Sequence, residues 1–239
     1  MSIMGIVPDA PSNRFLTLRK TPLFADLAEE ELTYIAQRAV QRHFAAGQAI
    51  FSEGDPCPGL WIIEQGRVRI FKSSPGGREQ VLAIEGPGSS VAELPVFDGG
   101  TYPASAVTVT DTLLLFTSKQ DFQSLCLKHP EVGLKVLRIV GRRLRGLVGI
   151  IEELSFGTVR DRLIALLLRM SQHGNKTSQG VEIELLTTNQ ELAAQIGTVR
   201  ELVSRNLSRL QAQDLIRVEG RKIIIHDPQA LQAELRDRE

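Results

Sequence analysis

Four side chains near residue 200 combine the hydrogen-bonding groups that can distinguish DNA bases. Their spacing places them on the outward face of one helix, in its N-terminal half. The four residues are Arg200, Glu201, Ser204 and Arg205. An arginine can bridge O6 and N7 of guanine with two hydrogen bonds, and a carboxylate can accept one from N4 of cytosine. The pattern therefore predicts a base-reading surface suited to a half-site that contains G·C pairs.

Two short helices separated by Gly197 are predicted to carry this surface. Each helix begins with Thr-x-x-Glu, the pattern of a capping box, which pairs Thr188 with Glu191 and Thr198 with Glu201. Both threonines are therefore expected at the helix starts, where DNA contacts occur. The buried face of the second helix is expected to consist of Val203, Leu207 and Leu210. Together these features predict a helix-turn-helix.

A β-hairpin is predicted directly after these helices. Residues 215–225 alternate in two strands around a glycine turn, with Arg221 and Lys222 at the tip. This is the expected wing of a winged helix-turn-helix, and its basic tip is placed to contact phosphate. Taken singly, each arginine could equally be ordinary surface charge, and Glu201 could serve only its capping box. The whole set of residues is what predicts DNA binding.

A long helix with a repeat of seven residues is predicted over 131–156. One heptad position holds Leu137, Leu144 and Ile151, and the other holds Val140, Leu147 and Leu154. Such a seam is typical of a coiled coil, so we expect these six residues to form a homodimer interface. The alternative is a single amphipathic helix packed on its own domain. The segment 156–158 then predicts a hinge.

Short β-favouring runs separated by glycines fill the chain from about residue 40 to 117. The runs 60–63, 68–71 and 113–116 are examples, and they predict a double-stranded β-helix or jelly-roll. Ahead of the roll, residues 24–35 are expected to form a helix. The fold class is therefore α+β. The expected divisions are an N-terminal tail over 1–21, a β-roll sensor domain over 22–130, a dimerisation helix over 131–156 and a DNA-binding domain over 157–239.

Composition narrows the functional classes. The chain of 239 residues has a formal net charge of zero, so a nucleic-acid partner must be inferred from local charge. The sequence has neither a signal peptide pattern nor an apolar run of membrane-spanning length. Cys57 and Cys126 are widely separated, which excludes a disulfide framework and a Cys-x-x-Cys motif. We therefore expect a cytoplasmic protein.

The chain resembles the Crp-Fnr superfamily, the cyclic-AMP receptor protein and its relatives, from about residue 22 to 228. The glycine-spaced roll, the Ala92-Glu93-Leu94 segment at the place of the family's Gly-Glu-Leu, and the Arg-Glu-x-x-Ser-Arg face carry the resemblance. It implies a cyclic-nucleotide-binding-like sensor domain and a homodimeric transcription factor that binds an inverted repeat of TGTGA-like or TTGA-like half-sites. It also implies activation through RNA polymerase.

The candidate effector pocket departs from the family pattern. Cyclic-AMP binders carry an Arg-Ser-Ala segment about ten residues after Gly-Glu-Leu, whereas 102–106 holds no arginine and places Ala104 and Ser105 there. The dimer-helix positions that contact adenine through hydroxyls in the family are Leu147 and Val148. An unpaired buried phosphate would cost several kcal/mol. Cyclic AMP is therefore disfavoured, although Ala92, Glu93 and Leu94 remain pocket candidates.

The residue types also limit which other cofactors and functions we expect. An iron-sulfur cluster needs four thiolates, which two cysteines cannot supply. Haem is an open alternative, because His43, His129, His173 or His226 could be an axial ligand, but a lone histidine is more often structural or exposed and we expect no metal ligand among them. Only His43 lies in the roll, so the histidine cluster of a metal-dependent oxygenase is missing and we expect no enzyme. The alternative function is an effector- or haem-binding sensor that acts mainly through protein interaction.

Overall fold

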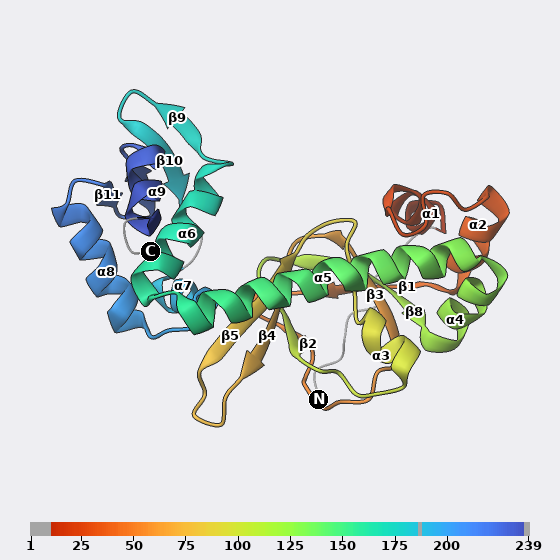
Figure 1. Ribbon diagram of the computed structural model, residues 1–239. Coiled ribbons are helices and arrows are strands. Elements are labelled where there is room, and N and C mark those ends of the chain that lie inside the picture. Colours follow the sequence, from red (N-terminus) through yellow and green to blue (C-terminus); the bar gives the residue numbers. More distant parts are fainter. Residues whose placement is uncertain (1–10, 186–187, 237–239) are drawn as a thin grey trace. The chain divides into compact units, whose positions relative to one another are not determined.

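The computed structural model describes residues 11–185 and 188–236 of the chain (Figure 1). The chain divides into two compact units. The first comprises Met1–Lys72 and Leu82–Gly146, and the second comprises Ser73–Val81 and Leu147–Glu239. Both mix helices and strands, so the predicted α+β class is confirmed. No helix in the described ranges is long and apolar enough to cross a membrane.

The β-roll consists of two four-stranded sheets. One has the strand order β1-β8-β3-β6 and the other β2-β7-β4-β5. The runs expected at 60–63, 68–71 and 113–116 lie in β3, β4 and β8, so these three strands are confirmed. The bounds are β1 (Val40–Phe44), β2 (Ala49–Phe51), β3 (Gly59–Gln65), β4 (Val68–Ser73), β5 (Glu79–Glu85), β6 (Ser90–Val91), β7 (Ser105–Thr108) and β8 (Thr112–Ser118).

Two apolar clusters hold the roll together. One lies inside it and includes Phe44, Trp61 and Tyr102. The other joins β3 and β8 to the surrounding helices through residues such as Phe24 and Phe122, whose rings meet edge to face. These helices are α1 (Pro11–Lys20), α2 (Glu29–Arg38), α4 (Lys119–Lys128) and the first turns of α5 (Pro130–Phe156). The short helix α3 (Glu93–Asp98) follows β6.

The helix expected over 24–35 begins later than predicted. Helix α2 starts at Glu29, because the carboxylate of Glu31 accepts a hydrogen bond of 2.8 Å from the amide of Ala28 and so caps the helix there. Residues 21–27 instead form successive turns, and these turns bury Phe24 completely. Residues 11–20 of the expected tail form α1, whose Leu18 is buried in the same apolar cluster.

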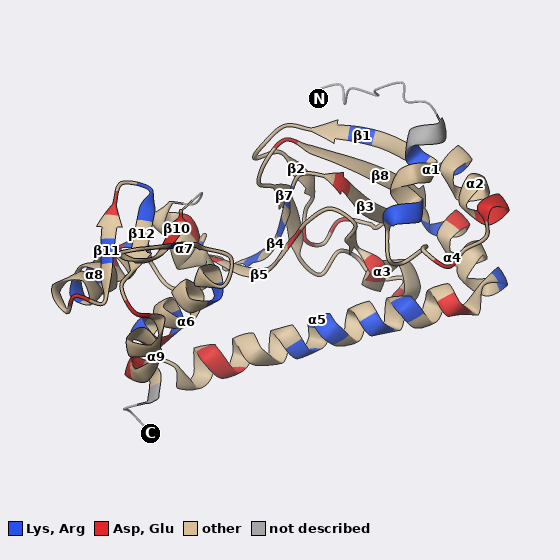
Figure 2. Cartoon of the chain, turned by 90° about the horizontal axis from the view of Figure 1, so that it is seen from above, with Lys and Arg blue, Asp and Glu red and all other residues tan. Residues whose placement is uncertain are grey.

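Helix α5 is continuous over 27 residues, as the heptad pattern predicts. Most of its seam is exposed in the single chain: Leu137 by 65%, Leu144 by 61%, Leu147 by 36%, Ile151 by 62% and Leu154 by 41%. Val140 is only partly buried, against the core of the first unit. The helix also contains four glycines, Gly133, Gly141, Gly146 and Gly149. A Cβ added at Gly133, Gly146 or Gly149 would meet no neighbouring atom within 4 Å, and one added at Gly141 would meet only the end of the Arg145 side chain. Basic residues are spaced along α5 (Figure 2).

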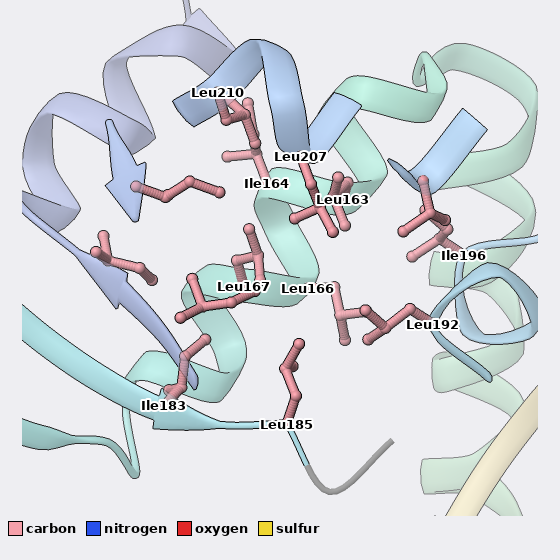
Figure 3. Packing of buried hydrophobic residues seen from close by; sticks show 14 of the residues in the cluster. Leu163, Ile164, Leu166, Leu167, Ile183, Leu185, Leu192, Ile196, Leu207 and Leu210 are labelled. Carbon is pink, nitrogen blue, oxygen red and sulfur yellow. The ribbon is translucent and has the colours of Figure 1, made fainter. Parts of the chain in front are cut away.

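The second unit is a helical layer on a small antiparallel sheet of order β11-β12-β10-β9. Its core is lined by Leu163, Leu167, Ile183, Leu192 and Leu210 among others, which converge from three helices and a strand (Figure 3). The bounds are α6 (Val159–Ser171), β9 (Asn175–Thr177), β10 (Gly180–Glu184), α7 (Asn189–Gln195), α8 (Arg200–Ala212), β11 (Ile216–Glu219), β12 (Lys222–Ile225) and α9 (Pro228–Arg236).

Candidate nucleic-acid interface and sensor site

The first helix of the predicted helix-turn-helix begins with the expected capping box. The Thr188 hydroxyl accepts a hydrogen bond from the Glu191 amide at 3.3 Å, and the Glu191 carboxylate accepts one from the Thr188 amide at 2.6 Å. Helix α7 ends at a turn in which Gly197 has a φ of +65°, a left-handed conformation that favours glycine. The amide of Thr198 donates to the carbonyl of Ala193 at 2.9 Å and closes this turn.

The second predicted capping box is wrong. The N-cap of α8 is Val199, which has no side-chain cap, and the helix begins at Arg200. The reason is that the Thr198 amide is engaged in closing the preceding turn, so the first helical bonds start one residue later, at the Val199 carbonyl. Glu201 is therefore not tied to Thr198, and among the described residues no hydrogen bond of its carboxylate is found. Thr198 itself is half-buried.

Helix α8 has one buried and one open face. Val203, Leu207 and Leu210 are buried as predicted. On the opposite side, Arg200, Glu201 and Arg205 are exposed. Ser204 is half-buried, and its hydroxyl accepts a hydrogen bond of 3.1 Å from the side-chain amide of Asn189 on α7. The structure therefore brings the four predicted base-reading residues together in the first two turns of one helix.

The predicted wing is the hairpin of β11 and β12, with basic residues at its turn (Figure 2). The two basic residues at the tip differ in their surroundings. The Lys222 ammonium lies 2.8 Å from the Glu182 carboxylate of β10, and this hydrogen bond and charge raise the pKa of Lys222. Arg221 is exposed, and its side chain has no ion pair within the described ranges. Arg221 is therefore the freer of the two predicted phosphate contacts.

The acidic residue of the candidate effector pocket is paired within the protein. Glu93 is only 1% exposed, and its carboxylate accepts hydrogen bonds from the Ser90 hydroxyl and from the Arg143 guanidinium of α5. Arg143 also lies 3.0 Å from Glu85 and donates to the Ser90 carbonyl at 2.6 Å. Burial raises the pKa of Glu93, and the charge of Arg143 partly offsets this rise. Sequence reasoning missed Arg143.

The neighbours of Glu93 on the chain have unusual positions. Ala92 has a φ of +77° and a ψ of 29°, the left-handed conformation in which a side chain is strained. Glycine, which the resemblance implies at this position, adopts this conformation without strain. Leu94, by contrast, is 47% exposed on α3 and lies outside the core of the roll.

The segment 102–106 holds no basic residue. Tyr102 is buried and stacks on Phe51 with ring centroids 3.8 Å apart. Ala104, two residues later, is also buried. The hydroxyl of Ser105 already accepts a hydrogen bond of 3.0 Å from the Glu53 amide. This stretch thus presents no cation to a phosphate. Leu147 and Val148 are exposed on the part of α5 that belongs to the second unit.

Among the described residues, the histidines are not part of a group that could hold a metal ion. In the ranges 11–185 and 188–236, no three His, Cys, Asp or Glu residues could hold a metal ion together. His43 is exposed on β1, and His173 is exposed after α6. His129 lies 2.9 Å from Glu31 and 3.4 Å from Glu131, and His226 contacts the Asp214 carbonyl at 2.9 Å.

Comparison with known proteins identifies the family of this two-part arrangement. Residues 41–129 match the cyclic nucleotide-binding domain, and residues 161–234 match the Crp-like helix-turn-helix domain. The cyclic AMP receptor protein of Thermus thermophilus is 34% identical over 201 residues, which cover 84% of this chain and 90% of that protein. The chain belongs to the Crp-Fnr family. It is a Crp-like transcription regulator with a DNA-binding helix-turn-helix.

Further relatives agree with this assignment. A CRP-like cAMP-activated global transcriptional regulator of Mycobacterium tuberculosis is 29% identical over 215 residues, which cover 90% of this chain and 96% of that protein. The structure of a c-di-GMP responsive global regulator of Xanthomonas campestris superposes with a TM-score of 0.75 at 25% identity, over 84% of this chain and all of that one. These full-length relatives are transcription regulators.

A lysophospholipase of Phaeosphaeria nodorum is also similar, but over a limited region. The match is 31% identical over 153 residues, which are 61% of this chain and 10% of the enzyme. The similarity therefore concerns a shared module within a much longer protein, and it carries no argument for catalysis by this Crp-Fnr protein.

Proposed function

We propose that this protein is a cytoplasmic homodimer that binds an inverted repeat of TGTGA-like or TTGA-like half-sites. The observation that carries the proposal is the open face of α8, where Arg200, Glu201 and Arg205 are exposed around Ser204. Two arginines and an unengaged carboxylate supply the donors and the acceptor that G·C pairs require in the major groove. The N-terminal half of a recognition helix is the part that reaches the bases.

The dimer follows from the apolar seam of α5. Leu137, Leu144 and Ile151 are each more than half exposed in the single chain. Exposed leucines at heptad spacing are covered in a coiled coil by the same residues of a second helix. A dimer places two recognition helices on one duplex, which accounts for an inverted repeat. We accordingly assign 22–130 to sensing, 131–156 to dimerisation and 157–239 to DNA binding.

The regulation proposed for the β-roll does not use cyclic AMP. Two of the relatives are named for cyclic AMP, but here Arg143 already neutralises the buried Glu93. The stacked Tyr102 and Phe51 and the absence of a cation over 102–106 also disfavour a cyclic phosphate. We expect saturating cyclic AMP to leave both the melting temperature and the DNA affinity unchanged.

The double substitution Arg200→Ala and Arg205→Ala tests DNA recognition. Each good bidentate contact contributes about 1–3 kcal/mol of discrimination, so the double variant should lose roughly a hundredfold or more in affinity for the preferred site. Fluorescence anisotropy with a selected inverted repeat and with scrambled DNA measures this loss. Arg209→Ala is the matched control, since Arg209 is exposed on the same helix but lies in its last turn.

The outcomes separate clearly. Loss of specific binding in the double variant, with the dimer retained in sedimentation and with Arg209→Ala unaffected, supports the proposal. Equal affinity of the wild-type protein for the inverted repeat and for scrambled DNA contradicts it, and it favours a helix-turn-helix that serves protein interaction.

A further inference from the structure

The guanidinium of Arg162 occupies a position where two helices end. Arg162 lies in the first turns of α6 and is only 9% exposed. Its Nε donates to the carbonyl of Ile196 at 2.7 Å. Its Nη1 donates to the carbonyl of Gly157 at 2.7 Å and to that of Glu153 at 3.3 Å. These acceptors belong to the C-terminal end of α5 and to the C-cap of α7, all within the second unit.

Both helix ends lack a basic residue of their own. Neither α5 nor α7 has a basic residue in its last turn. A helix C-terminus carries unsatisfied carbonyls and a partial negative charge, which a cation stabilises. Arg162 supplies one cation to both ends. Within the described residues it has no carboxylate partner, and the nearby Glu153 carboxylate pairs instead with Arg169 at 2.9 Å.

The planar guanidinium makes this connection directional. Nε and Nη1 point along fixed directions of one rigid plane, so their acceptors are held at a fixed relative orientation. A lysine ammonium in this place carries the same charge but no such plane. Ile196 immediately precedes Gly197, the turn of the helix-turn-helix, and it belongs to the same apolar cluster as Leu163 of α6 (Figure 3).

The backbone around this joint leaves little freedom. A Cβ added to Gly157 would lie 2.8 Å from the Glu153 carbonyl oxygen and 3.6 Å from Cγ of Arg162. A Cβ added to Gly197 would lie 2.7 Å from Cδ2 of Leu154 on α5. Both glycines therefore permit close approach between the end of α5 and its neighbours. The end of α5, the start of α6 and the turn before α8 form a single packed joint centred on Arg162.

We propose that Arg162 is a positioning residue that sets the orientation of the recognition helix relative to the end of the dimerisation helix. This inference rests on the proposed function, in which two copies of α8 must engage two half-sites of one duplex. The orientation at the joint then determines which spacing between half-sites both copies can reach together. Arg162 thereby contributes to operator specificity without contacting DNA.

Selection of DNA from a random pool tests this role with the full-length dimer. Wild-type protein, Arg162→Lys and Arg169→Met are compared for selected half-site sequence, for the distribution of half-site spacings, and for affinity to paired and single half-sites. Arg169→Met is the matched control, because Arg169 lies on the same helix and contacts the same residue, Glu153, at an exposed position. Sedimentation and thermal unfolding report the dimer and the fold.

Arg162→Lys should keep the half-site sequence and the dimer but accept a wider range of spacings. Its affinity for the best paired site should fall at least about tenfold, while affinity for a single half-site stays within about twofold, because the advantage of binding both halves depends on geometry. Gly157→Ala displaces the same helix end with Arg162 intact and should broaden the spacing likewise. If Arg162→Lys does not fold, the spacing distribution of Gly157→Ala tests the proposed role of the joint.

An unchanged spacing distribution in both variants, or equal losses on paired and single sites, overturns the role of Arg162 alone. A wild-type protein that selects no repeated motif overturns the proposed function, and with it this role.

Discussion

Arg143 and Glu93 form an ion pair although 50 residues separate them in the sequence. Glu93 is buried at the start of α3, and Arg143 lies on α5 with its side chain 27% exposed. The pair joins the β-roll to the helix that carries the exposed apolar seam. Within the region that matches the cyclic nucleotide-binding domain, the protein thus pairs its own buried carboxylate with an arginine of α5.

Removal of Arg143 should destabilise the protein, and more so at higher pH. Burial raises the pKa of Glu93 in the folded protein above its ordinary value of 4.5. The stability that the protonated carboxyl contributes is therefore fully present below pH 4.5 and is lost as the pH rises through the raised pKa. Arg143→Met removes the charge that offsets this rise, so the pKa of Glu93 rises further and the loss of stability continues to higher pH. The expected cost near neutral pH is on the order of 2 kcal/mol, discounted for the partial exposure of Arg143.

Urea unfolding at about pH 5 and about pH 7.5 measures how this loss of stability depends on pH. Arg142→Met is the control, because Arg142 is the exposed neighbour on α5. The double variant Arg143→Met with Glu93→Gln removes the buried charge and should recover part of the loss. A deficit that is the same at both pH values would contradict the assignment of the effect to Glu93.

Ala92→Gly should stabilise the protein. Ala92 has a φ of +77°, which strains any residue with a Cβ but not glycine. We expect the energy gained by relieving this strain to exceed the entropic cost of ordering the more flexible glycine on folding. The free energy of unfolding should therefore rise by roughly 0.5–1 kcal/mol. Denaturant titration measures it. Ala106→Gly in β7 is the control and should destabilise, because Ala106 is buried in a strand without a positive φ.

The two threonines of the helix-turn-helix should respond differently to alanine. Thr188 caps α7, so Thr188→Ala should lower the free energy of unfolding by about 1 kcal/mol. Thr198 caps no helix, because Val199 holds that position in α8, and Thr198→Ala should cost less than about half as much. Thermal unfolding of the two variants side by side provides the comparison. Equal losses would argue for a second capping box after all.

Leu144→Glu should convert the dimer to monomers and abolish tight binding to the paired site. Leu144 is 61% exposed in the single chain and lies at the middle of the seam, where a charge would have to be buried against its counterpart. Analytical ultracentrifugation measures the association. Leu127→Glu is the control, since Leu127 is 84% exposed on α4 and away from the seam. An unchanged dimer in Leu144→Glu would rule out the seam.

The features that sequence predicts well are those that local periodicity determines. Val203, Leu207 and Leu210 are buried because residues three and four apart share one face of a helix. The exposed arginines of α8 follow from the same geometry. The Thr188 capping box is likewise local, since all its bonds lie within four residues.

The features that sequence does not predict depend on where distant segments meet. Nothing near Arg143 signals its pairing with Glu93, because that contact depends on how α5 packs on the roll. Arg162 is similarly inconspicuous, since its acceptor at Ile196 is 34 residues away. Helix α8 starts one residue later than the Thr-x-x-Glu pattern predicts, because the Thr198 amide donates to the Ala193 carbonyl. The pattern itself does not reveal this hydrogen bond.

The four glycines of α5 have a consequence for how the protein assembles. Each costs a helix roughly 1 kcal/mol relative to alanine, so this segment is a poor helix on its intrinsic propensity. Its regular shape is supported by packing on the β-roll at one end and, in the proposed dimer, by a second chain along the exposed leucines. We therefore expect the helicity of this segment to increase with protein concentration. Ordering of the segment and pairing of the chains would then be one equilibrium, governed by how much of the protein the cell contains.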